Sequence, residues 1–221
     1  MSRGDPAAPA RRLTYGAVLA LVVGTYAVSL ALDGTVGTAV AALLQVVTVR
    51  LSLMHSRARP RVLRFASAAL GAVVVAVVVV LAQAALGNPP PDVVVTGLFT
   101  LNALLYLVAA QSILRDVLLA GRVDGGIVLA AIAAYLQIGM AFAFVYLAIA
   151  SVTTAFTTPV DVDDVLFFSF VTLSTTGYGD VVVTGWVAET TAVLEIVVGQ
   201  FFLVTAVGKI VAVWVPRRSG G

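Results

Sequence analysis

The sequence predicts an all-α membrane protein with six transmembrane helices, a short re-entrant helix and an irregular loop between the fifth and sixth spans. Three observations predict this class. Of the 221 residues 61% are hydrophobic and 11% charged, with a mean hydropathy of +1.08, whereas soluble domains carry about 25% charged residues. The apolar residues fall into six long stretches. A seventh apolar run, 165–173, is too short to cross a bilayer and precedes a glycine-containing segment.

The six stretches are each close to the roughly 20 apolar residues that a transmembrane helix needs. They are 13–32, 36–54, 62–86, 93–114, 126–151 and 186–215. The second is the weakest candidate, because Thr38, Gln45 and Thr48 dilute it. The first is preceded by a basic tail, 1–12, as in a signal peptide, but its apolar run exceeds the roughly 7–15 residues of a signal-peptide core. We therefore expect it to be the first span.

Charge placement predicts the orientation of the chain. With six spans, all thirteen Lys and Arg residues fall on one side, in the tail 1–12, the second and fourth loops and the C-terminal tail 216–221 or next to these segments. The positive-inside rule makes this side cytoplasmic. The opposite loops are acidic, with Asp33, Asp92, Asp161, Asp163, Asp164 and Asp180. We therefore expect a multi-pass protein of the cell membrane with both termini in the cytoplasm.

The first four spans, residues 13–114, are expected to form a four-helix unit, joined to the rest by a cytoplasmic linker, 115–125, that lies on the inner surface. The fourth span contains no charged side chain, so this unit is not expected to sense voltage, which requires charges within the span. Four arginines cluster in the loop before the third span and are expected to mark the topology or to contact anionic lipid: Arg57, Arg59, Arg61 and Arg64.

Several classes of function find no support in the composition. The chain has no cysteine and one histidine, His55, so thiolate and histidine metal centres are not expected. No nucleophile–base constellation, metal cluster or phosphate-binding loop indicates an enzyme. We expect no cofactor and no nucleic-acid partner.

The segment 172–180 reads TLSTTGYGD. Irregular backbone at membrane depth is tolerated only where it is buried in protein or lines a water-filled cavity. A backbone that points successive carbonyls in one direction needs alternating conformations, some with positive φ, which Gly177 and Gly179 adopt at low cost. The pattern T-x-G-Y-G-D resembles the selectivity filter of potassium channels, and the resemblance extends over about residues 130–215 as outer helix, pore helix, filter and inner helix.

The resemblance implies that 126–215 is a pore domain and that K⁺, the permeant ion, is bound by carbonyls of Thr175, Thr176, Gly177 and Tyr178, with Gly179 completing the filter. Four chains are needed to surround an ion, which implies a homotetramer. The pore helix is expected at about 163–174, with acids at its start, where they favour the positive helix end. Asp180, Asp161 and Asp164 are expected at the outer mouth.

The resemblance also implies residues that support the filter. Phe167 and Phe168 stand where the family often has tryptophans, and Thr176 stands where it usually has valine or isoleucine. Gly199 falls at the family's inner-helix hinge, with close helix packing as the alternative. Glu195 is an ionisable group within a span and therefore a functional candidate; it can brace the pore helix from behind or face the cavity.

We interpret the sequence as a homotetrameric potassium channel without an intrinsic voltage sensor. A weakly selective cation channel is the nearest alternative, because of Thr176 and the missing tryptophans. A transporter subunit is less consistent with a single well-formed filter repeat in the chain. A non-conducting scaffold would leave the filter without a use.

Overall fold

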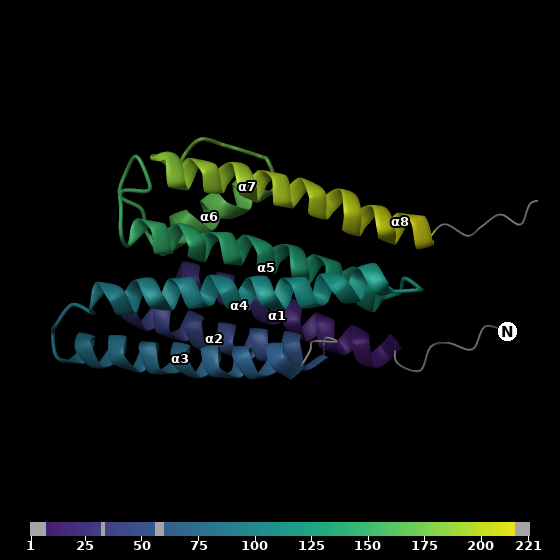
Figure 1. Ribbon diagram of the computed structural model, residues 1–221, viewed down its shortest axis with the longest axis horizontal. Helices are drawn as coiled ribbons and strands as arrows, with labels where there is room; N and C mark the ends of the chain where they lie inside the picture. The colour runs from purple at the N-terminus through teal and green to yellow at the C-terminus, as the bar shows by residue number, and fades with distance from the viewer. Residues whose placement is uncertain (1–7, 32–33, 56–59, 215–221) are drawn as a thin grey trace, which may run out of the picture.

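The computed structural model describes residues 8–31, 34–55 and 60–214, and these are helical apart from the connecting loops and one isolated β-bridge. Figure 1 shows the helices lying nearly side by side along the long axis. They are α1 (Ala8–Ala31), α2 (Gly34–His55), α3 (Pro60–Ala85), α4 (Asp92–Leu119), α5 (Gly125–Ala150), α6 (Val162–Leu173), α7 (Trp186–Phe202), a π-helical segment (Leu203–Val207) and α8 (Gly208–Trp214). The predicted all-α class is confirmed.

Four helical stretches are long and apolar enough to cross a membrane: Val62–Ala85, Asp92–Leu119, Gly125–Ala150 and Trp186–Ala212. The last runs through α7, the π-helical segment and most of α8. Among the described residues the apolar parts of α1 and α2 are shorter, Leu13–Ser29 and Val40–Met54. The chain is thus a helical protein with four candidate spans, and the total of six stays a prediction.

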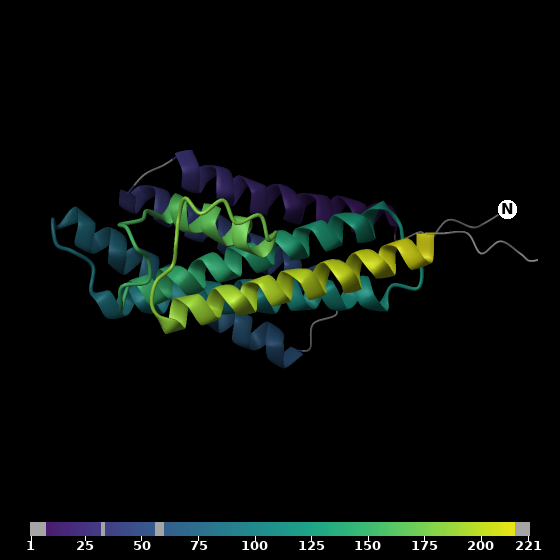
Figure 2. The same cartoon turned by 90° about the horizontal axis from the view of Figure 1, so that it is seen from above.

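The helix α5 lies at the centre of the fold. Helices α1, α2, α4 and α5 form a four-helix bundle, in which α4 and α5 make the most extensive contact, while α3 packs on the outside against α2 and α4. On its other side α5 contacts α6 and α7, as the two views in Figures 1 and 2 show. Helix α5 therefore contacts helices of the first expected unit, 13–114, as well as the other helices of the second, 126–215, and the division into these two units stays a prediction.

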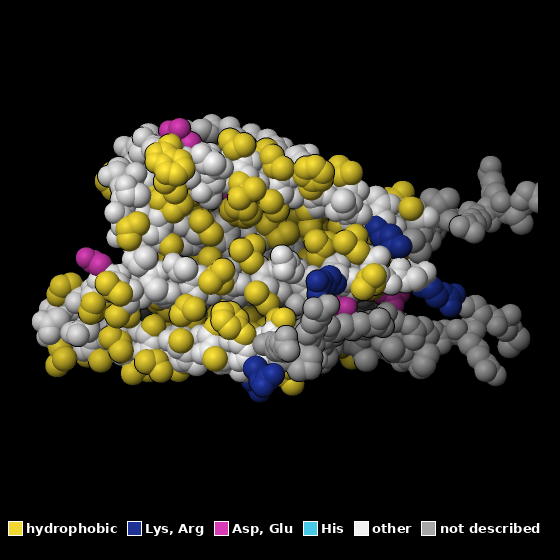
Figure 3. Space-filling model, viewed as in Figure 1, with side chains coloured by type: hydrophobic (Ala, Val, Ile, Leu, Met, Phe, Trp, Pro, Cys, Tyr) yellow, Lys and Arg dark blue, Asp and Glu magenta, His cyan; other side chains and the backbone are white. Residues whose placement is uncertain are grey.

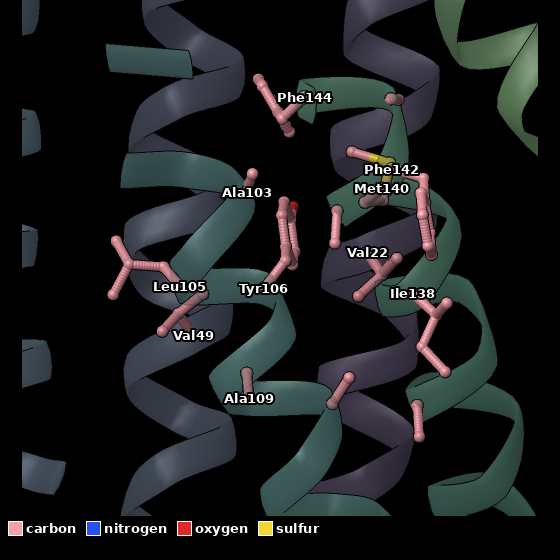
Figure 4. Close-up of a cluster of buried hydrophobic side chains, with 14 of the residues drawn as sticks. Val22, Val49, Ala103, Leu105, Tyr106, Ala109, Ile138, Met140, Phe142 and Phe144 are labelled. Atoms are coloured by element: carbon pink, nitrogen blue, oxygen red, sulfur yellow. The ribbon is translucent and has the colours of Figure 1, made fainter. Parts of the chain in front are cut away.

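Small side chains on α5 explain this central position. Ala130, Ala133, Ala134 and Ala141 are all fully buried, and small residues let neighbouring helix backbones approach closely. Figure 4 shows part of the resulting core, in which Val22 of α1, Val49 of α2, Tyr106 of α4 and Met140 of α5 meet between the helices.

The polar residues that weakened the second predicted span point into this bundle. Gln45 of α2 is fully buried, and its amide donates a hydrogen bond to the Asn102 carbonyl oxygen of α4 at 3.1 Å. The Gln137 amide of α5 donates to Ser52 Oγ of α2 at 2.9 Å. Hydrogen bonds between helices are a normal means of association inside membranes, so these residues support α2 as a packed helix.

Part of the segment expected as a linker, 115–125, is helical in the structure. Helix α4 continues to Leu119, and only residues 120–124 connect it to α5, where Asp124 accepts a hydrogen bond from the Ile127 backbone N–H at 2.9 Å. The end of α4 also contacts α1, because Tyr15 Oη donates to the Asp116 carboxylate at 2.8 Å. A connection this short makes α4 and α5 antiparallel neighbours.

On the face that Figure 3 shows, the described Lys and Arg side chains lie toward the end of the molecule where α1 begins and α8 ends. Of the four arginines predicted to contact lipid, Arg57 and Arg59 and the side chain of Arg61 lie outside the described residues, and Arg64 is exposed. The predicted orientation and the lipid contact stay predictions.

The central position of α5 makes its buried alanines sensitive to larger side chains. We expect Ala134→Leu to reduce the free energy of unfolding by about 1–3 kcal/mol, because extra methylene groups force α5 away from its neighbours. Ala68→Leu on the exposed side of α3 makes the same chemical change and is expected to leave stability unchanged. Thermal unfolding of both variants in detergent measures this; equal stability of the two would contradict the position assigned to α5.

Candidate functional site

The helix α6 is the short helix predicted between the fifth and sixth spans, and it occupies Val162–Leu173. Its first turn contains Asp163 and Asp164, and the Asp161 backbone N–H donates to the Asp164 carboxylate at 3.1 Å. Acids in this position interact favourably with the helix dipole. Val165 and Leu166 are buried, which holds the helix against the rest of the chain.

The loop after α6 has an alternating backbone. Thr175, Gly177 and Gly179 have φ of +58°, +58° and +85°, while Thr176 and Tyr178 do not have positive φ. Such alternation in the sign of φ turns successive carbonyls to the same side of the chain. The sequence predicts it at the two glycines. It does not predict it at Thr175, where a β-branched residue with positive φ is a genuine outlier of the kind that clusters at functional sites.

Hydrogen bonds hold both ends of this loop. At the inner end the Val171 carbonyl oxygen accepts from the backbone N–H groups of Thr176 at 2.9 Å and Gly177 at 3.4 Å. At the outer end Phe156 and Val183 form the isolated antiparallel β-bridge. Flanking bonds join Thr157 N to Val182 O at 3.0 Å and Thr184 N to Ala155 O at 2.9 Å. These bonds join the segment that follows α5 to the segment that precedes α7.

The two aromatic residues predicted to support the loop do different things. The Phe167 ring stacks on the Tyr178 ring, with centroids 6.1 Å apart and planes 7° apart. The Phe168 ring instead packs edge-on against Tyr146 and Phe156, at 5.1 and 5.7 Å. Phe167 thus contacts the loop directly, whereas Phe168 attaches α6 to α5 and to the outer bridge.

Glu195 of α7 is fully buried behind α6. Tyr146 Oη of α5 donates to Glu195 Oε2 at 2.8 Å, and Ser169 Oγ of α6 lies 2.5 Å from Glu195 Oε1. Ser169 Oγ also lies 2.7 Å from the Gly139 carbonyl oxygen of α5. The two partners, Tyr146 and Ser169, were not predicted; the signal that could have revealed Ser169 is that it interrupts the apolar stretch VLFFSFV.

Two glycines allow α6 to approach its neighbours. A Cβ at Gly199 of α7 would lie 2.4 Å from the Leu173 carbonyl oxygen, and a Cβ at Gly139 of α5 would lie 2.5 Å from the Phe170 ring. Real Cβ atoms essentially never come so close. Of the two interpretations that the sequence left open for Gly199, the structure shows the close packing, and α7 is regular through this residue.

The irregular part of the long C-terminal helix lies one turn further on. Residues Leu203–Val207 are π-helical, and Thr205 Oγ1 donates to the Phe201 carbonyl oxygen at 2.6 Å. Single π-helical turns inside α-helices occur frequently at functional sites. This segment is therefore a second candidate for a bend, and the sequence pattern did not indicate it.

Polar side chains lie at the inner end of the loop. Gln200 Nε2 of α7 is 3.4 Å from Thr175 Oγ1, and Thr176 Oγ1 is 2.9 Å from Ser174 Oγ. The hydroxyl of Thr176 therefore has a polar neighbour where the resemblance implied an apolar side chain. Gln200 was not among the predicted site residues.

The predicted acidic residues lie at the start of α6 and after the loop. Carboxylate oxygens of Asp161, Asp163 and Asp164 lie within 4.8 Å of one another, with Asp161 and Asp163 exposed and Asp164 partly buried. Asp180 is exposed. These three aspartates are the acids that the sequence predicted at the start of the short helix.

A comparison with protein families matches residues 130–215 to a family described as "Ion channel", a pore family with two transmembrane helices. No curated protein and no solved structure gives a significant match. The matched residues include most of α5, then α6, the loop, α7 and α8. This part of the chain therefore resembles an ion-channel pore, which indicates passive ion conduction and a membrane location rather than enzymatic activity.

Gly199 offers a direct test of this packing. We expect Gly199→Ala to destabilise the protein by about 1–3 kcal/mol, because the methyl group would displace the end of α6 from which the loop emerges. Gly208→Ala is the matched control, since nothing lies within 4 Å of a Cβ at that helical position. Thermal unfolding compares the two, and a Gly199→Ala protein as stable as the control would contradict the close approach.

Proposed function

We propose that the protein is a potassium-selective channel in which four copies of the chain surround one pore. The observation that carries the proposal is the backbone of the TTGYG segment, with positive φ at every second residue from Thr175 to Gly179. K⁺ leaves water only if oxygen atoms replace its hydration shell, and rings of backbone carbonyls from four chains provide them.

In this proposal each part of the site has a role in conduction. The carbonyls of Thr175, Thr176, Gly177 and Tyr178 bind successive ions, and the Thr175 hydroxyl closes the inner end. Gln200 lies beside that inner end. At the outer end Asp180 and the aspartates of the α6 start raise the local concentration of cations, because clefts lined by one sign of charge attract the opposite ion.

The exposed surface of one chain supports the tetramer. Tyr178 is 67% exposed, and α7 and the π-helical segment expose large apolar side chains, among them Val193, Leu194, Phe201 and Val204. A single chain supplies one strand of a filter and cannot enclose an ion. Neighbouring chains that cover this face would complete the ring and bury the Tyr178 ring behind the filter.

We infer that opening bends the inner helix at Leu203–Val207 rather than at Gly199. At Gly199 the helix backbone packs closely against Leu173, and bending there would break this contact. The π-helical segment, in contrast, already departs from regular helix geometry. The described residues of α4 within its apolar part, 93–114, contain no charged side chain, so we do not assign opening to voltage.

A weakly selective cation channel is the second candidate, and one observation favours it. The Ser174–Thr176 hydroxyl pair lies at the support of the filter, where an apolar side chain would pack more firmly. A filter that is less rigid discriminates less between K⁺ and Na⁺, if selectivity depends on a fixed cavity size.

Reversal potentials test the main proposal. In a planar bilayer with K⁺ on one side and Na⁺ on the other, we expect the purified protein to reverse near the K⁺ equilibrium potential. Gly177→Ala should abolish selective current, because alanine adopts φ of +58° only with strain. Gly71→Ala, at an unobstructed position of α3, is the control and should conduct normally. Current that reverses near zero would refute potassium selectivity.

The Thr176→Val variant separates the two candidates. Valine has the shape of threonine without the hydroxyl, so it removes the contact with Ser174 Oγ and leaves the backbone unchanged. If the polar pair loosens the filter, the ratio of K⁺ to Na⁺ permeability should rise, by roughly tenfold for about 1.4 kcal/mol of improved discrimination. A ratio that is unchanged or falls would show that the hydroxyl does not limit selectivity.

A further inference from the structure

The Ser169 hydroxyl has two close oxygen neighbours but only one proton. Its Oγ lies 2.7 Å from the Gly139 carbonyl oxygen and 2.5 Å from Glu195 Oε1. A carbonyl oxygen can only accept a hydrogen bond, and an ionised carboxylate can only accept as well. With an ionised Glu195, one of these two contacts would bring lone pairs together without a proton between them.

The second oxygen of Glu195 does not change this count. Tyr146 Oη lies 2.8 Å from Glu195 Oε2 and has a single proton, which it donates to that oxygen. All three side chains are fully buried, as Tyr146, Ser169 and Glu195 are each 0% exposed. The additional proton that these contacts require can therefore come only from the carboxyl group of Glu195.

We propose that Glu195 is protonated in the folded protein and donates a hydrogen bond from Oε1 to Ser169. The bonds then run in one direction: Tyr146 donates to Glu195, Glu195 donates to Ser169, and Ser169 donates to the Gly139 carbonyl. Each of these three hydrogen bonds then contains one proton. We call this series of hydrogen bonds the Glu195 relay.

The surroundings are consistent with a neutral group. The hydrogen-bonding partners of Glu195 in the described chain are two hydroxyl groups, with no basic side chain among them. An ionised carboxylate buried without a positive partner is very costly. The other titratable groups on the packed elements are Tyr135 of α5, the aspartates at the exposed start of α6, and the exposed Glu189 of α7.

The relay joins the three helices that carry the filter. It connects α5 at Gly139 and Tyr146, α6 at Ser169, and α7 at Glu195. Ser169 stands two residues before Val171, whose carbonyl oxygen holds the Thr176 and Gly177 amides. Glu195 is therefore a positioning residue that acts on the filter through α6. This role rests on the proposed function, whereas the protonation itself does not.

Infrared spectroscopy of the full-length protein in detergent tests the protonation directly. A protonated carboxyl group gives a stretching band that an ionised carboxylate lacks, so a band at pH 7 that disappears in Glu195→Gln is assigned to Glu195. We expect this band in the wild type and its loss in Glu195→Gln. A wild-type spectrum without it would overturn the proposal, whether or not the variant folds.

The variants separate a neutral donor from a charged group. In Glu195→Gln the amide N–H₂ can donate to Ser169 and the amide oxygen can accept from Tyr146, so we expect a melting temperature equal to that of the wild type. Ser169→Ala removes the middle of the relay and should lower it by roughly 5 °C. Ser67→Ala, the same change at an exposed position of α3, should have no effect. A Glu195→Gln protein as unstable as Glu195→Leu would overturn the relay.

Conduction is measured separately. If the protein is a selective channel, Glu195→Gln should keep the wild-type ratio of K⁺ to Na⁺ permeability, and Ser169→Ala should lower it; a lowered ratio in Glu195→Gln would contradict the positioning role. If the wild type proves unselective, the proposed function fails while the infrared and melting results still decide the protonation.

Discussion

In the proposed channel the loop backbone presents its carbonyls to an ion and cannot use them to hold itself in place, so other contacts must fix it. Inside a membrane, water is not available to stabilise an irregular loop, so the surrounding protein must fix it. Here the loop 174–180 is held at its inner end by the Val171 carbonyl, at its outer end by the Phe156–Val183 bridge, and at its side by Phe167. The helix α6, which carries most of these contacts, is in turn fixed to α5 and α7.

The helix α5 connects this site to the N-terminal helices. Its alanine-rich part completes the bundle with α1, α2 and α4, and its opposite side contacts α6. The missing side chain of Gly139 admits the Phe170 ring of α6, and Tyr26 of α1 meets the same ring edge-on, with centroids 5.5 Å apart. Helix α6 therefore packs against α1 as well as α5. A change in the bundle can therefore reach α6 and the loop that follows it through this contact.

Buried polar residues serve two purposes in this chain. Gln45, Asn102, Gln137 and Ser52 join helices of the bundle by single hydrogen bonds. Tyr146, Glu195 and Ser169 form a continuous network at the back of the candidate pore. Such a network fixes the relative positions of three helices more closely than apolar contacts do, because hydrogen bonds depend on direction as well as distance.

The sequence by itself determined the helical membrane class, the position of α6 to within a residue, and positive φ at Gly177 and Gly179, since these follow from local composition and from the freedom of glycine. It also marked Glu195 as unusual, because a charge within a span is costly. Only the tertiary structure decided that α5 belongs to the bundle, that α4 extends to Leu119, that Phe167 and Phe168 face different partners, and that Ser169 and Tyr146 meet Glu195. The side-chain contacts depend on the rotation of each helix about its axis, and in spans that are apolar on all sides no periodic pattern specifies that rotation.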